Sequence, residues 1–272
     1  MSLNSSEKID NPDHRKTSMD YTARLKLLFS RNKWWMVVVL SAWVYLGFTV
    51  SGLLVQVLLQ AMVTFGVSLA NVNQSILGAS AAALLYVLTV AMVIGLPWLL
   101  KKIKTSRADL GVKGLPTWTD ILLAPAGFVV YLILSGFLIL AATKLFPGFD
   151  VSQAQETGFG SLSHQYEYIL AFLTLVVIAP VAEELLFRGY LFGKLGKYAP
   201  IWVSAILTSL LFGFLHGAWN VAIDTFALSI VLCSLRVASG SLWSPMLLHM
   251  LKNGIAFYIL FINPLLSNTL GG

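Results

Sequence analysis

Long apolar runs separated by short polar segments dominate the chain from Trp34 onward. A membrane-spanning helix needs about 20 mostly apolar residues, and the first run exceeds one crossing, so we expect it to tilt or bend near Gly52. The pattern predicts an all-α, polytopic transmembrane helical bundle of about seven (six to eight) spans within residues 34–272. The predicted spans are Trp34–Ala70, Ile76–Leu100, Asp120–Lys144, Glu167–Lys197, Pro200–His216, Trp219–Ala238 and Leu242–Ile262.

The polar segments predict how the bundle is oriented. Seven of the 18 lysines and arginines lie in residues 1–33 and five more between Lys101 and Lys113. Cytoplasmic segments of membrane proteins carry such an excess of basic residues. We therefore expect residues 1–33 to form a cytosolic tail without a cleaved signal peptide, and the 101–117 loop to be cytosolic. The loop 146–166, which holds acids, is expected on the outer side.

Composition supports this interpretation. The chain of 272 residues is 57% hydrophobic and only 11% charged, whereas soluble domains carry about 25% charged residues. The net charge of +6 does not indicate nucleic-acid binding, because the basic residues belong to the loops and the tail. The expected partner of the chain is therefore the lipid bilayer. The single cysteine, Cys233, excludes an internal disulfide and is expected to be a small buried apolar residue.

Three charged residues interrupt the fourth predicted span: Glu183, Glu184 and Arg188. Each costs about 2.5–3.5 kcal/mol in hydrocarbon, so they need partners or a function. Adjacent helical residues point about 100° apart, and Glu184 is spaced to pair with Arg188 one turn later. Glu183 is then left without a local partner, which suits a general base. Alternatively, both acids only connect helices. Pro180 is expected to loosen the helix one turn earlier.

A histidine in the next span is expected near Glu183. Glu183 lies 16 residues before Ala199, at the turn between the two spans, and His216 lies 17 residues after it. Equal residue counts give equal rise in an antiparallel hairpin, so both side chains should lie at one depth. Phe212 is one turn before His216 and shares its face.

The last span carries another polar pair. His249 and Asn253 are four residues apart and share a helix face, where two donors in line could stabilise an oxyanion. They could equally be polar contacts between helices. Lys252 lies off that face. Asp224, in the sixth span, could be a second partner, a substrate contact or a structural hydrogen-bonding group.

Several kinds of chemistry have no support in the sequence. It contains no H-E-x-x-H zinc motif and no Walker loop, and no G-x-S-x-G elbow. One glutamate and two histidines without a shared helical spacing are an unconvincing zinc set. We therefore expect no cofactor; if a metal is bound, its ligands would be Glu183, His216 and His249.

Three motifs resemble the CPBP family, which includes type II CAAX prenyl proteases, bacteriocin-processing enzymes and abortive-infection homologues. They are EExxxR at Glu183–Arg188, FxxxH at Phe212–His216 and HxxxN at His249–Asn253, all within residues 180–256. The resemblance implies an intramembrane endopeptidase that hydrolyses membrane-embedded or lipidated substrates. The resemblance also implies a role for each residue. Glu183 and His216 would activate water, and His249 and Asn253 would stabilise the oxyanion. Glu184 and Arg188 would support the site.

The expected location is a bacterial or archaeal cell membrane, with the active site inside the membrane and open to the cytosol. Two other functions remain open from the residues alone. A proton-coupled transporter could use buried glutamate and histidine as a relay, although the first three spans hold almost no ionisable groups. A non-catalytic scaffold or immunity protein that binds a membrane peptide is the other possibility.

Overall fold

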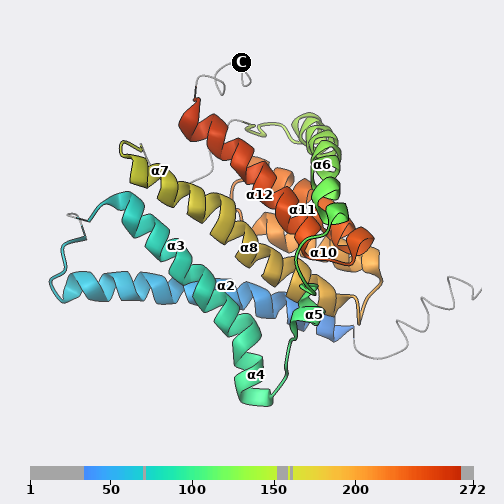
Figure 1. Cartoon of the computed structure of the whole chain (residues 1–272), viewed down its shortest axis with the longest axis horizontal. Helices are drawn as coiled ribbons and strands as arrows, with labels where there is room; N and C mark the ends of the chain where they lie inside the picture. Colours follow the sequence, from blue (N-terminus) through green and yellow to red (C-terminus); the bar gives the residue numbers. More distant parts are fainter. Residues whose placement is uncertain (1–33, 70–71, 152–158, 160–161, 265–272) are drawn as a thin grey trace, which may run out of the picture.

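The computed structural model describes residues 34–69, 72–151, 159 and 162–264, and all long elements within them are helices (Figure 1). The predicted N-terminal tail, residues 1–33, lies outside the described residues. The elements in chain order are α2 (Trp35–Thr64), α3 (Gln74–Val90), η3 (Ala91–Gly95), α4 (Leu96–Lys101), α5 (Arg107–Leu110), α6 (Trp118–Leu145), α7 (Gln165–Phe172), η4 (Leu173–Ile178), α8 (Ala179–Glu184), η5 (Leu185–Phe192), α9 (Gly193–Leu195), α10 (Ile201–Phe214), α11 (Trp219–Ser239), α12 (Trp243–Phe257) and η6 (Tyr258–Ile262).

Six helices in the described part of the chain are long and apolar enough to span a membrane. This confirms the predicted all-α polytopic bundle and makes the chain an integral membrane protein. The first of them, α2, runs for 30 residues through Gly52 without a break. The predicted fifth span, α10, has only 14 residues, or about 21 Å at 1.5 Å per residue. It is therefore shorter than a hydrocarbon core of about 30 Å.

The helix that carries both acids is continuous for 31 residues, Gln165–Leu195. It contains two π-helical stretches, η4 and η5, which flank α8. Pro180 lies in the first turn of α8, where its missing N–H cannot complete a regular hydrogen bond to the preceding turn. The expected loosening near Pro180 is thus present as the π-helix η4, and Glu183 and Glu184 follow on the α8 segment.

Close helix packing fixes α10 against α11. A Cβ atom added to Gly213 would lie 2.6 Å from the carbonyl oxygen of Ala222, so only glycine allows this approach. Gly217, in the turn between the two helices, has a φ of +78°, which favours glycine. The hairpin therefore holds His216 in a short, tightly packed turn.

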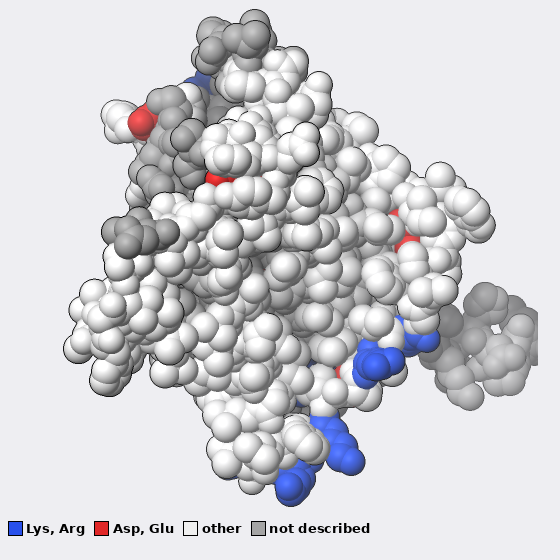
Figure 2. All heavy atoms as spheres, turned by 60° about the vertical axis from the view of Figure 1, so that its left-hand side comes forward, with Lys and Arg blue, Asp and Glu red and all other residues white. Residues whose placement is uncertain are grey.

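One end of the bundle carries most of the described basic residues. In Figure 2 most of the lysine and arginine atoms lie along the lower edge of the molecule. The 101–117 loop binds the start of α12 there, because Leu242 N–H donates to the Gly111 carbonyl at 3.0 Å and Trp243 Nε1 to the Gly114 carbonyl at 2.6 Å. We call this the basic end. Its exposed basic residues are Lys101, Lys102, Lys104, Arg107, Lys113 and Lys197.

Candidate active site

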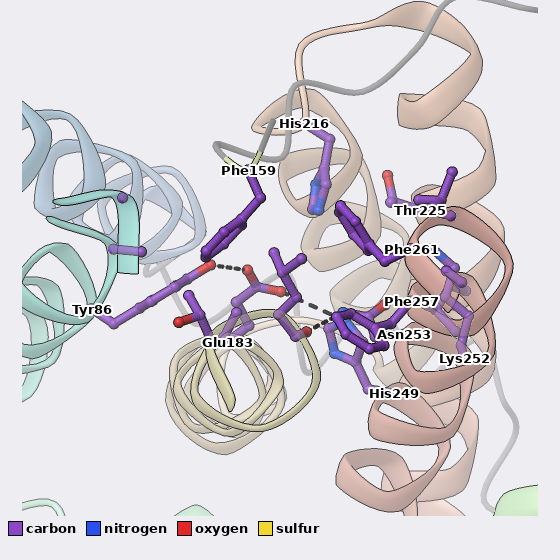
Figure 3. A pocket seen from close by; sticks show the side chains of 18 of the residues that line it. Tyr86, Phe159, Glu183, His216, Thr225, His249, Lys252, Asn253, Phe257 and Phe261 are labelled. Carbon is purple, nitrogen blue, oxygen red and sulfur yellow. Dashed lines mark hydrogen bonds and ion pairs between the residues drawn. The ribbon is translucent and has the colours of Figure 1, made fainter. Parts of the chain in front are cut away.

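A cavity of about 380 Å³ lies between α3, the α7–α8 helix, the α10–α11 turn and α12. Figure 3 shows its side chains converging from these separate elements. Four residues singled out by the sequence line it: Glu183, His216, His249 and Asn253. The bundle therefore brings the three sequence motifs to one place.

Glu184 and Arg188 form the predicted ion pair, with 2.7 Å between Arg188 Nη1 and Glu184 Oε1, and both side chains are fully buried. The same carboxylate oxygen lies 2.8 Å from His249 Nδ1. An ionised carboxylate paired with arginine can only accept hydrogen bonds. The Nδ1–H group of His249 therefore donates a hydrogen bond to Glu184. Glu184 thereby fixes the orientation of the His249 ring and directs Nε2 toward Glu183.

Glu183 has a partner that the sequence did not reveal. The Tyr86 hydroxyl, from α3, donates to Glu183 Oε1 at 2.5 Å. The second carboxylate oxygen, Oε2, lies 3.7 Å from His249 Nε2. That separation is too long for a direct hydrogen bond, and a water molecule bonded to both groups would lie to one side of the line between them. A tyrosine within an apolar span was the only available signal for Tyr86.

The Phe212 ring contacts both His216 and His249. The His216 Nδ1 donates to the Phe212 carbonyl oxygen at 2.7 Å, so Nε2 is the nitrogen left for the cavity. The Phe212 ring centroid lies 4.8 Å from that of His216 and 5.9 Å from that of His249. Arg188 Cζ lies 4.4 Å from the same ring. Phe212 is therefore a buried ring that packs against both imidazoles and against Arg188.

Asn253 connects α12 to the acid-bearing helix. Its Nδ2 donates to the Leu175 carbonyl oxygen at 2.9 Å. Leu175 belongs to η4, where the π-helical hydrogen-bond pattern differs from that of an α-helix. The amide has two N–H groups, so one remains for a ligand in the cavity.

Asp224 and Lys252 form a second polar cluster, in which Lys252 lines the cavity and Asp224 lies behind it. Asp224 Oδ1 accepts from Tyr131 at 2.7 Å and from Ser135 at 2.5 Å, both on α6. Its Oδ2 lies 3.5 Å from Lys252 Nζ. The sequence left several roles open for Asp224, and the structure gives it these hydrogen bonds.

The site residues do not form an evident metal centre. Among the described residues, no group of three or more His, Cys, Asp and Glu side chains could hold a metal ion. The Nδ1 atoms of His216 and His249 are both committed to protein acceptors. Both rings therefore keep Nε2 for the cavity, an arrangement that histidine ligands of metals also show, and the expected absence of a metal stays a prediction.

The residues that line the cavity extend from Glu183 away from the basic end, and the expected opening toward the cytosol stays a prediction. Its distal lining includes Gly78 near the start of α3, Phe159 before α7, and Phe261 in η6. In the other direction, the large side chains of Phe187 and Leu191 are buried in an apolar cluster. The apolar packing closes that side, because bulky residues follow the acids through η5.

Comparison with known proteins gives a match to one family model and to curated relatives. Residues 165–255 match the family model described as type II CAAX prenyl endopeptidase Rce1-like. The chain is 35% identical over 89 residues to an uncharacterized 24.3 kDa protein of Escherichia coli, covering 31% of this chain and 41% of that protein. It is 24% identical over 144 residues to the membrane-embedded CAAX protease MroQ of Staphylococcus aureus, covering 51% and 57%.

The chain thus spans about half the length of the curated relatives it matches. No solved structure matches it. The matched segment contains Glu183, His216 and His249, whereas Tyr86 lies outside it.

Proposed function

We propose that this membrane protein, whose residues 165–255 match the Rce1-like model of type II CAAX prenyl endopeptidases, hydrolyses peptide bonds of membrane-embedded or lipidated substrates through Glu183. The proposal depends on one connected group of side chains. Tyr86, Glu183 and His249 line the cavity, and the buried pair of Glu184 and Arg188 holds His249 from behind. This group combines a free carboxylate oxygen with an imidazole that a second, arginine-paired carboxylate holds in place.

Glu183 removes a proton from the water that attacks the peptide carbonyl. Tyr86 holds one carboxylate oxygen, so the other is directed at the water between Glu183 and His249. His216 supports this step, because its Nε2 can accept the second hydrogen of the water. When the C–N bond breaks, Glu183 returns its proton to the leaving amine, so the carboxylate is regenerated.

His249 and Asn253 stabilise the negative charge on the tetrahedral intermediate. The His249 Nδ1–H stays bonded to Glu184, and a proton on Nε2 lets the same ring donate to the oxyanion. Asn253 donates the N–H group that does not bind Leu175. Donors held in place before the reaction, away from bulk water, contribute most to this kind of catalysis. Each step uses protein groups and water, and we propose that no metal is required.

The proposed orientation places the basic end in the cytosol, following the distribution of lysine and arginine. On this orientation substrates reach Glu183 from the half of the membrane farther from the cytosol. A charged, membrane-impermeant thiol reagent tests this in intact spheroplasts. Leu260→Cys, in the cavity lining, should be labelled and Lys104→Cys, at the basic end, should not; Cys233 is buried. The reverse pattern would contradict the orientation.

Purified protein in proteoliposomes should cleave a fluorogenic transmembrane peptide or a farnesylated peptide. Glu183→Gln and His249→Gln should each lower kcat by at least about 100-fold, the usual contribution of a general base. His164→Ala is the matched control, because this histidine is exposed and lies outside the cavity. Cleavage by Glu183→Gln at the wild-type rate would refute the proposal.

A further inference from the structure

Lys252 places a positive charge inside the cavity, at a position that the three sequence motifs do not include. It lies on α12, three residues after His249 and next to Asn253, and it lines the cavity. A charged residue within a membrane helix is costly and usually has a function. The proposed hydrolysis does not use Lys252, so its role needs a separate explanation.

The contacts of Lys252 leave its ammonium group only partly paired. Asp224, its partner, is held by hydroxyl groups of Tyr131 and Ser135 on α6, so the carboxylate is fixed. The distance of 3.5 Å from Lys252 Nζ to Asp224 Oδ2 exceeds the 2.7–2.9 Å of a strong charge-assisted hydrogen bond. An ammonium group has three N–H donors. Donors therefore remain for another acceptor.

The surroundings of Lys252 favour an anion. Of the described residues that line the cavity, Lys252 alone is a lysine or arginine, and Glu183 is the one carboxylate. Apolar side chains such as Leu228 and Phe257 form much of the remaining wall. Charges attract one another more strongly in such a poorly hydrated space than in water. The side chain of Lys252 is 19% exposed, so a ligand in the cavity can reach it.

We propose that Lys252 is an anion-binding subsite that binds a carboxylate of the bound peptide. The peptide identity of the ligand rests on the proposed function. His249 and Lys252 are separated by about 4.5 Å along the α12 axis, and an extended peptide advances about 3.4 Å per residue. The carboxylate therefore lies about one to two residues from the scissile bond, on the side of Lys252. Its source is either a free C-terminus or an acidic side chain.

Binding of short fluorescent peptides to the detergent-solubilised Glu183→Gln variant tests this without cleavage. Three apolar peptides of one sequence differ at the end: a free carboxylate, a carboxamide, and a carboxamide with aspartate as the last residue. One charge-assisted hydrogen bond predicts about tenfold tighter binding of the free-carboxylate peptide than of the neutral amide. If the aspartate peptide also binds tightly, the subsite accepts either a C-terminal or a side-chain carboxylate. If it binds weakly, the subsite requires the C-terminal carboxylate.

Lys252→Met in the same background should abolish the preference for a carboxylate, and Lys252→Arg should retain it. A purely structural Lys252–Asp224 ion pair predicts a different result: Lys252→Met would lower the melting temperature and weaken all three peptides equally. Lys252→Gln serves as the second neutral variant if Lys252→Met does not fold.

Two results with the Glu183→Gln variant, in which Lys252 is intact, would overturn the subsite. One is equal binding of the free-carboxylate and carboxamide peptides, and the other is that none of the three peptides binds. These results are independent of the cleavage assay, which tests Glu183. A protein that cleaves both acid and amide peptides equally would keep the proposed function and lose the subsite.

Discussion

Replacement of Tyr86 by phenylalanine removes one hydroxyl group from the candidate site and leaves the ring. The ring packs edge-on against Phe48, with 6.5 Å between ring centroids, and this contact is retained in the variant. The lost contact is the 2.5 Å hydrogen bond to Glu183 Oε1. Without it, the carboxylate is free to rotate away from the attacking water.

The size of the effect follows from the type of hydrogen bond. A hydrogen bond to a charged group contributes about 1.5–3 kcal/mol, and each 1.4 kcal/mol corresponds to about a tenfold change. Tyr86→Phe should therefore lower kcat by about 10- to 100-fold. KM should stay nearly constant, because Tyr86 acts on the catalytic carboxylate and not on the bound substrate.

The assay is cleavage of a fluorogenic peptide in proteoliposomes, with the melting temperature measured on the same preparations. Tyr45→Phe is the matched control, because Tyr45 is exposed on the surface of α2 and does not line the cavity. An unchanged kcat in Tyr86→Phe would refute the positioning role. A loss of kcat that follows a loss of folded protein would show that Tyr86 only stabilises the bundle.

Three further predictions concern stability and cofactors. Arg188→Met leaves the buried Glu184 carboxylate without its cation and should destabilise the protein by about 3–5 kcal/mol. Thermal unfolding in detergent measures this loss, and an unchanged melting temperature would contradict the prediction. Gly213→Ala should destabilise the α10–α11 contact by about 1–3 kcal/mol, whereas Gly136→Ala, which meets no atom within 4 Å, should not. Dialysis against EDTA should leave cleavage unchanged, and recovery of lost activity by zinc would refute a metal-free site.

Much of the fold could be predicted from hydropathy alone, because spans in a bilayer must be apolar and helical. The six long helices lie where the apolar runs predicted them. Counting residues from the turn at Ala199 predicted that Glu183 and His216 lie close together. Both side chains line the same cavity. The turn between these two helices is short, and the rise per residue is uniform in their α-helical parts, although η5 departs from it.

Other features depend on tertiary packing and have no periodic signal. The depth of His249 relative to Glu183 depends on how α11 and α12 tilt, and the structure brings Nε2 within 3.7 Å of Glu183 Oε2. Tyr86 comes from α3, about one hundred residues earlier, and only the three-dimensional arrangement pairs it with Glu183. The direction of the cavity likewise depends on which side the bulky residues of η5 fill.

The short length of α10 has a consequence for the bilayer. At about 21 Å, it falls roughly 9 Å short of an average hydrocarbon thickness, so the lipids beside the His216 turn must thin or admit water. Such hydrophobic mismatch costs a fraction of a kcal/mol per ångström. Vesicles made from shorter acyl chains would relieve that deformation, which makes the local supply of water to the cavity, and hence turnover, sensitive to membrane thickness.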